Sequence, residues 1–110
     1  MKGEHLGELE ELVLLTIGSL YKEAYAVAIL EEIKNNANRT MDVTAVHSVL
    51  RRLEKKGYTK SEMGGATADR GGRRKRFFVL TQVGRKVLDD TMELRVALYN
   101  KMPKLAFVRI

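Results

Sequence analysis

The chain contains no cysteine, no tryptophan, a single proline and only two histidines among its 110 residues. The absence of cysteine excludes disulfides, thiolate zinc sites and a cysteine nucleophile. A metal site built on His5 and His47 would need carboxylate ligands, and the HExxH type of spacing is missing. Long apolar runs are missing as well, since runs such as residues 12–15 are short. We therefore expect no metal site and no membrane-spanning segment.

Sequence patterns typical of enzymes are also missing. The glycine pairs at 64–65 and 71–72 fit neither a GxxxxGK[ST] nor a GxGxxG pattern, so they indicate turns rather than a phosphate-binding loop. His47 has no serine or aspartate arrangement around it that would support acid–base or nucleophilic chemistry. We expect no catalytic residues and no cofactor. The start of the chain lacks the apolar stretch of a signal peptide, which favours a cytoplasmic protein.

The composition is that of a soluble globular domain, with 45% apolar and 31% charged residues. The net charge of +6 is unevenly distributed along the chain. Residues 1–37 hold three Lys or Arg against seven Asp or Glu, whereas residues 38–86 hold thirteen against four. A basic middle after an acidic start favours a surface that binds a polyanion such as nucleic acid. The alternative is a solvated charged face that only keeps the protein soluble.

Apolar periodicity predicts three helices in the first half of the chain. Residues 7–20, 25–34 and 41–57 each place apolar side chains at helical spacing. Asp42 is a good N-cap for the third helix, and Gly57 is a good stop after it. Asparagines 35, 36 and 38 are expected to end the second helix. Three short helices of this kind are long enough to enclose one small core.

The third predicted helix has two chemically different faces. Val46, Val49, Leu50 and Leu53 cluster on one arc, and small hydroxyls and cations lie on the opposite arc. Small polar residues at the start of a helix allow close approach to base edges, and cations further along can contact phosphates. The residues expected to contact DNA on this helix are Thr44, Ala45, His47, Ser48, Arg51, Arg52 and Lys55.

A β-hairpin is predicted after the third helix. Residues 58–63 and 73–80 can form its strands, and the glycine-rich residues 64–72 can form the turn. Alternation along the return strand should turn one of Phe77 and Phe78 inward. Such a hairpin after a basic helix is called a wing, and its cations can lie along a phosphate backbone. The wing residues expected to contact DNA are Arg70, Arg73, Arg74, Lys75 and Arg76.

A last helix is predicted from the N-cap Thr81 to about Asn100, before Pro103. It follows a complete small domain, so its broad apolar face has little left to pack against. We expect a dimer formed by pairing of this helix with a second copy, although it could instead fold back on its own domain. The sequence thus divides into residues 1–80, for DNA binding, and 81–110, for dimerisation. The expected dimer contacts are Val87, Thr91, Leu94, Leu98 and Tyr99.

Residues 7–15, 45–58 and 69–81, together with Gly84, resemble the PadR family of bacterial transcription regulators. The ordered combination of these stretches is specific, although each alone is weak. The resemblance implies a winged helix-turn-helix that dimerises through a C-terminal helix and represses genes from a palindromic operator. A small-molecule effector at the dimer interface is compatible with it. His47 stands where the family usually has tyrosine, and the missing tryptophan removes the planar-drug site of some compact members.

The sequence therefore predicts a mainly α-helical fold with a small β-hairpin, that is, a winged helix-turn-helix followed by a long dimerisation helix. The favoured function is a homodimeric regulator that binds double-stranded DNA. A symmetric dimer should prefer an inverted repeat whose half-site centres are about one helical turn, roughly 10 bp, apart or a multiple of that. The alternative is a winged helix that binds RNA or a protein partner. That class would favour exposed aromatic side chains, and this sequence has few.

Overall fold

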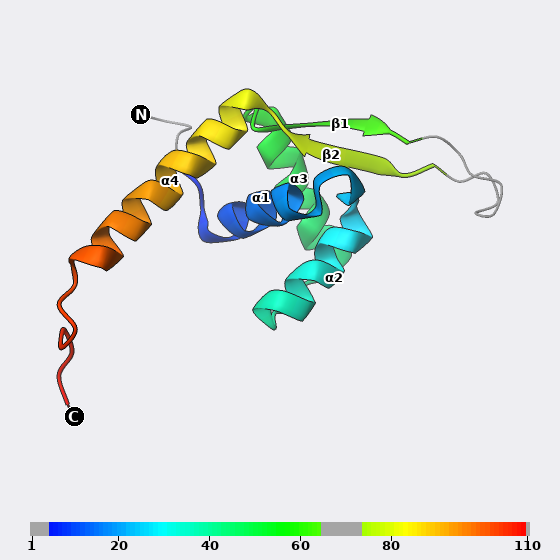
Figure 1. Cartoon of the computed structure of the whole chain (residues 1–110). Coiled ribbons are helices and arrows are strands. Elements are labelled where there is room, and N and C mark those ends of the chain that lie inside the picture. The colour runs from blue at the N-terminus through cyan, green and yellow to red at the C-terminus, as the bar shows by residue number, and fades with distance from the viewer. Residues whose placement is uncertain (1–4, 65–73, 110) are drawn as a thin grey trace.

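The computed structural model describes residues 5–64 and 74–109, and the predicted order of helices and hairpin is confirmed (Figure 1). The fold is mainly α-helical, with a two-stranded antiparallel sheet inserted between the third and last helices. The elements are α1 (Glu8–Leu20), the 3-10 helix η1 (Tyr21–Glu23), α2 (Ala26–Ala37), α3 (Val43–Lys55), β1 (Thr59–Met63), β2 (Arg76–Leu80) and α4 (Gln82–Lys101).

Capping residues explain where most of the helices begin and end. The Asp42 carboxylate accepts a hydrogen bond from the Ala45 N–H at 2.8 Å, and the Thr81 hydroxyl accepts one from the Gly84 N–H at 3.0 Å. Gly57, after α3, has φ 84°, the left-handed conformation that glycine adopts without strain. α2 continues to Ala37, three residues beyond the predicted end, and the left-handed Asn38 follows it as the C-cap.

One hydrophobic core joins α1, α2, α3, the hairpin and the start of α4. Each of the three N-terminal helices contributes one face, as the helical periodicity predicts. Leu88 connects the first turns of α4 to the same core, so this part of α4 belongs structurally to the domain. The buried apolar residues are Val13, Leu14, Ile17, Ala24, Ile29, Ile33, Val46, Val49, Leu50, Leu53, Tyr58, Phe78 and Leu88.

The hairpin lies against the segment that leads into α2. β1 and β2 pair in antiparallel register from Thr59 opposite Leu80 to Met63 opposite Arg76. The Phe78 N–H donates to the Ala24 carbonyl at 2.8 Å, and its ring is buried in the core. Phe77, on the other face of β2, remains half-buried, so the strand turns one phenylalanine inward as predicted. These contacts fix the middle of β2 beside the N-terminus of α2.

α4 begins on the domain and then extends away from it (Figure 1). Its first turn lies close to the loop after α3, where the Thr81 N–H donates to the Tyr58 carbonyl and the Thr81 hydroxyl donates to the Gly57 carbonyl. Residues 93–109 are exposed, and the molecule is elongated, with extents of 58 × 32 × 21 Å.

Candidate nucleic-acid interface

The outward face of α3 carries most of the polar residues predicted to contact DNA. Burial of the opposite, apolar face holds α3 in a fixed rotation about its axis. Five of the seven predicted residues are exposed in this orientation and two, Ala45 and Ser48, are half-buried. The exposed five are Thr44, His47, Arg51, Arg52 and Lys55.

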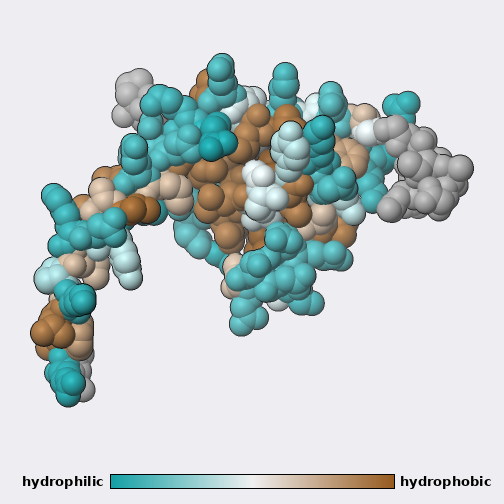
Figure 2. All heavy atoms as spheres, in the orientation of Figure 1, coloured by the Kyte–Doolittle hydropathy of each residue, from teal (hydrophilic) through white to brown (hydrophobic). Residues whose placement is uncertain are grey.

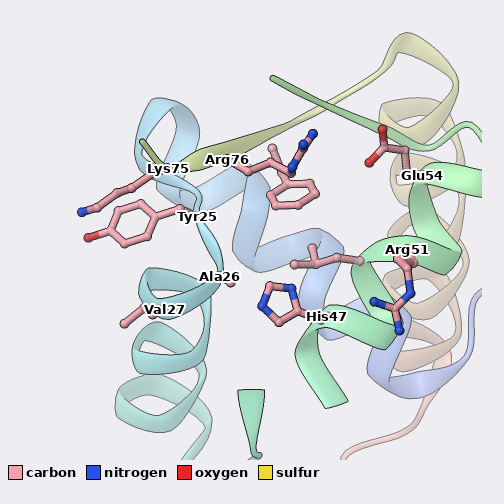
Figure 3. A pocket seen from close by; sticks show the side chains of 10 residues that line it. Tyr25, Ala26, Val27, His47, Arg51, Glu54, Lys75 and Arg76 are labelled. Atoms are coloured by element: carbon pink, nitrogen blue, oxygen red, sulfur yellow. The ribbon is translucent and has the colours of Figure 1, made fainter. Parts of the chain in front are cut away.

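α3 and β2 share one open pocket, which contains side chains from both predicted contact groups (Figure 3). His47 and Arg51 come from α3, while Arg76 comes from β2 and Lys75 from the residue before it. The pocket encloses about 490 Å³, and its lining also includes Leu50 and Phe78 of the core. Two basic elements that are separated in the sequence are thus brought to one surface by the fold.

A hydrogen-bond chain joins the hairpin to α3. The Arg76 guanidinium donates to the Ser61 hydroxyl at 3.0 Å, and that hydroxyl in turn donates to the Glu54 carboxylate at 3.1 Å. Arg76 and Glu54 both line the pocket, whereas Ser61 lies on the neighbouring strand β1. The chain restricts how far β2 can move relative to α3, and it holds the Arg76 side chain on the shared surface.

Tyr25 is a candidate contact residue that sequence reasoning assigned only to the apolar stripe of the second helix. It is the N-cap of α2 and lines the pocket. The Lys75 ammonium lies 3.9 Å from the centroid of its ring, and Phe77 packs edge-on against the same ring at 5.5 Å between centroids. Tyr25 therefore positions a wing cation. The sequence offered one indication of this role: Tyr25 is an aromatic residue at the start of the helix that precedes the basic third helix.

Arg52 is engaged within the fold. Its Nε donates to the Glu10 carboxylate of α1 at 3.3 Å, and its Nη1 lies 3.3 Å from the Ser48 hydroxyl. The Lys56 ammonium contacts both oxygens of Glu10, at 2.9 and 3.0 Å. Arg52 and Lys56 therefore tie the C-terminal part of α3 to α1. A DNA contact by Arg52 remains a prediction, and it would have to coexist with the Glu10 ion pair.

Glu10 is a nearly fully buried carboxylate whose charge is stabilised by its neighbours. Burial raises the pKa of Glu10, but the Gly7 N–H, the Lys56 ammonium and the Arg52 guanidinium together outweigh burial. The pKa of Glu10 consequently lies below its ordinary value of 4.5. A carboxylate with a lowered pKa stabilises the folded state above the pKa that it has in the unfolded chain. This contribution is lost as the pH falls through the lowered pKa.

We expect Glu10→Gln to lower the free energy of unfolding by about 1–3 kcal/mol at pH 7, because the two cations lose a buried partner. Urea titrations at pH 7 and at successively lower pH should show the difference from the unmodified protein shrinking as Glu10 becomes protonated. Glu8→Gln is the matched control, since Glu8 pairs with Arg39 on the exposed side of α1. A Glu10→Gln effect that stayed constant down to pH 3 would contradict the ion-pair explanation.

Part of the predicted wing contact set lies outside the described residues. Arg70 and Arg73 belong to that part, so their contacts stay predictions. Arg74 is described and exposed. With Lys75 and Arg76, it places three cations in sequence at the described end of the hairpin, next to the pocket.

The predicted dimer contacts follow α4 from its packed end to its exposed end. Val87 and Thr91 are half-buried, and Val87 packs against the core. Leu94, Leu98 and Tyr99 are 59%, 57% and 73% exposed. Apolar atoms are visible at the surface along α4 and the segment after it (Figure 2). α4 therefore presents an apolar surface that this single chain does not cover.

Two structural absences bear on metals and membranes. Within residues 5–64 and 74–109, His, Asp and Glu side chains nowhere gather in a group of three or more that could hold a metal ion. Each helix of the described chain is too short or too polar to bridge a lipid bilayer.

Comparison with known families gives one decisive match. The model of the transcriptional regulator PadR-like family matches residues 9–90, which include α1 to α3, the hairpin and the first turns of α4. The chain belongs to the PadR family. Members of this family are DNA-binding transcription regulators rather than enzymes. This confirms the resemblance from the sequence and the prediction of a DNA-binding regulator.

Solved structures support the same fold. A PadR-like transcription factor from Bacteroides fragilis is 25% identical, with 84% of each chain covered and a TM-score of 0.69. A transcriptional regulator from Clostridium thermocellum is 25% identical over 87% of this chain and 90% of that one, with a TM-score of 0.64. A PadR family regulator from Eggerthella lenta is 23% identical over 93% and 88%, with a TM-score of 0.67. A comparison with curated protein sequences finds no significant match.

Proposed function

We propose that this PadR protein is a homodimeric repressor that binds an inverted-repeat operator, with one α3 in each half-site. The observation that carries the proposal is the shared surface of α3 and β2, where His47 and Arg51 lie in the same pocket as Lys75 and Arg76. One helix and one cationic strand on a common surface can contact a groove and its neighbouring backbone together.

α3 is the element suited to the major groove. The groove is wide enough to admit an α-helix, and residues near the N-terminus of a recognition helix contact base edges. Thr44 and His47 occupy the first two turns of α3 and are exposed. Arg51 and Lys55 are exposed further along, where cations can contact phosphates. We therefore assign base contacts to the start of α3 and backbone contacts to its end.

The wing is suited to the phosphate backbone beside that groove. Arg74 is exposed, Lys75 is held over the Tyr25 ring, and Arg76 is hydrogen-bonded to Ser61. Cations on a hairpin can contact phosphates of any sequence, so they add affinity but little discrimination. The predicted contacts of Arg70 and Arg73 extend the same role toward the tip of the wing.

Pairing of α4 with a second copy is the economical way to cover its exposed apolar face. Leu94 and Leu98 are one helical turn apart on α4, so they lie on one side of it. They continue the line of Val87 and Thr91, and Tyr99 adds an exposed ring next to Leu98. We propose that residues 1–80 bind DNA and residues 81–110 form the dimer. The first turns of α4 also complete the core, and the rest of α4 forms the dimer contact.

Repression follows from occupancy of promoter DNA by the dimer, and a small-molecule effector could relieve it. A groove of about 760 Å³ runs along α4 from Gln82 to Leu94, and its lining also includes Tyr58, Val83 and Val87. It adjoins the surface that we assign to the dimer. A ligand in this groove would alter how the two α4 helices pack, and so the distance between the two α3 helices.

The assignment of roles predicts different failures for α3 and wing variants. Thr44→Ala with His47→Ala should cost about 1–3 kcal/mol on a duplex selected by the unmodified protein, with much less effect on random duplex. Arg74→Gln with Lys75→Gln should weaken binding to both duplexes. It should also reduce the slope of log binding constant against log salt concentration by about 0.9 for each phosphate that is no longer neutralised. Salt titrations of binding to both duplexes measure these effects.

Lys86→Gln is the matched control, because it removes a cation from α4 outside the shared surface. It should leave the discrimination between the two duplexes unchanged. If the wing variant lost discrimination while the α3 variant kept it, the two roles would be reversed. If the unmodified protein preferred single-stranded RNA to both duplexes, the alternative of an RNA-binding winged helix would replace this proposal.

A further inference from the structure

Two neighbouring carboxylates of α1 pair with two different helices. Glu10 contacts Arg52 of α3 and Lys56, the residue that caps α3, as described above. Glu11 forms a bidentate pair with Arg95 of α4: its two oxygens lie 3.0 Å from Nε and 2.8 Å from Nη2 of that guanidinium. Successive residues on a helix point about 100° apart, so adjacent carboxylates can face different neighbours. The first turns of α1 thus connect the proposed recognition helix with the proposed dimerisation helix.

α4 is attached to the domain at two separate places. The first is near its N-terminus, where Gly84 lies against the Tyr58 backbone and Leu88 enters the core. The second is the Glu11–Arg95 pair, which lies eleven residues beyond Gly84, about 16 Å along the helix axis. Among the described residues, no hydrogen bond or ion pair to the domain lies further along α4. Apolar packing near the N-terminus of α4 holds the helix on the domain, and an ion pair about 16 Å further along restricts the angle at which the helix leaves it.

The direction of α4 decides where the two α3 helices of a dimer lie. If the dimer is held by α4, each winged domain is positioned by the angle at which it joins that helix. A swing of about 10° about Gly84 displaces a point about 16 Å away by about 3 Å, close to the axial rise of one base pair. A small change of angle is therefore large enough to change which operator spacing fits.

We propose that Glu11 and Arg95 are positioning residues that set the half-site spacing of the operator. The inference rests on the proposed function, because it needs a dimer held by α4 and one α3 in each half-site. The pair is better suited to fixing the direction of α4 than to raising the free energy of unfolding. The Arg95 side chain is 58% exposed, and partly exposed ion pairs add little to stability. Its bidentate geometry, by contrast, restricts the guanidinium to one orientation.

A spacing series tests the inference. Inverted repeats that differ by single base pairs between the half-sites are titrated with the unmodified protein, Glu11→Gln and Arg95→Gln, alongside a random duplex. The unmodified protein should prefer one spacing by roughly tenfold or more over its neighbours, as expected for paired half-sites. Both variants should remain dimers by light scattering and bind random duplex normally, while their preference falls to about threefold or less.

Two further variants distinguish a change in the direction of α4 from the general effect of removing a charge. Arg85→Gln removes another arginine of α4, whose ion pair is with Asp89 one turn along the same helix, so this variant should keep the spacing preference. Exchange of the charges, Glu11→Arg with Arg95→Glu, should restore part of the preference that either single reversal abolishes. Rescue of this kind would not follow if either residue acted alone.

Three outcomes would overturn the inference. The first is an unchanged spacing profile in Arg95→Gln, and the second is a parallel loss of affinity at every spacing. Either outcome would show that the Glu11–Arg95 pair does not set the half-site spacing through the direction of α4. The proposed dimer on paired half-sites would still stand. The third is an unmodified protein with no preferred spacing, which would overturn the proposed function itself and the inference with it.

Discussion

Gly84→Ala should destabilise the protein by about 3 kcal/mol or more, at the upper end of what overpacking costs. A Cβ at residue 84 would lie 2.0 Å from the Tyr58 carbonyl oxygen and 2.7 Å from its carbonyl carbon. These are backbone atoms of the loop that also accepts the Thr81 N–H, so they cannot rotate away as a side chain would. Relief requires α4 to lift from the domain, which would expose Leu88 and break the capping contacts of Thr81.

Thermal and urea unfolding followed by circular dichroism measure this effect. For a domain of this size, a loss of about 3 kcal/mol lowers the Tm by roughly 10 °C or more. Gly18→Ala is the matched control, because its Cβ would meet only the end of the Leu80 side chain, at 3.3 Å. Alanine is favoured over glycine within a helix, so the control should be neutral or more stable by up to about 1 kcal/mol. Equal Tm values for both variants would contradict the close contact.

Leu94→Glu combined with Leu98→Glu should convert the proposed dimer into a monomer and lower operator affinity about a hundredfold or more. A dimer that binds two half-sites at once has roughly 10²–10⁴ times the affinity of one domain for one half-site, because its two domains are linked. A monomer lacks this advantage. The carboxylates would have to be buried without partners in the dimer, whereas in the monomer they would lie in water. Light scattering and titration of the selected operator give the two readouts.

The variant should keep its fold, because Leu94 and Leu98 are more than half exposed in the single chain. Asn100→Glu adds a carboxylate to another side of the same exposed part of α4, and it should remain a dimer. An unmodified protein that is monomeric at micromolar concentration would refute the assignment of α4 to dimerisation.

Local features of the fold were predictable from the sequence because their causes are local. The apolar stripe of α3, the caps Asp42 and Thr81, and Gly57 after α3 act over a few residues, and the structure has each of them where it was expected. Strand alternation likewise predicted one inward phenylalanine. Family resemblance then supplied the arrangement of helices and hairpin, which periodicity alone leaves open.

The partners of charged residues were not predictable, because they come from distant parts of the chain. Glu10 is one of three acidic residues in the first turn of α1, where acidic residues are common, yet it is buried against Arg52 and Lys56, more than forty residues away. Arg52 was expected to contact DNA, and although its side chain is 51% exposed, its Nε pairs with Glu10. Only the packing of α1 across α3 brings these groups together, and no spacing rule encodes it.

Tyr25 illustrates the same limit on the candidate site. It is the first residue of the helix predicted at residues 25–34, whose apolar side chains recur at helical spacing. The folded hairpin instead places it beside Phe77 and under the Lys75 ammonium, at the rim of the shared pocket. A residue at the end of an apolar stripe can thus face either the core or a functional surface. The neighbouring element, and not the helix itself, decides between them.

Footprinting of the purified protein on DNA that it selects from a genomic fragment pool tests the central claim most directly. The account predicts protection of an inverted repeat with two-fold symmetry, whose half-site centres are about one helical turn, roughly 10 bp, apart or a multiple of that. A single asymmetric site of a few base pairs, protected with the same affinity by the Leu94→Glu, Leu98→Glu variant, would contradict it.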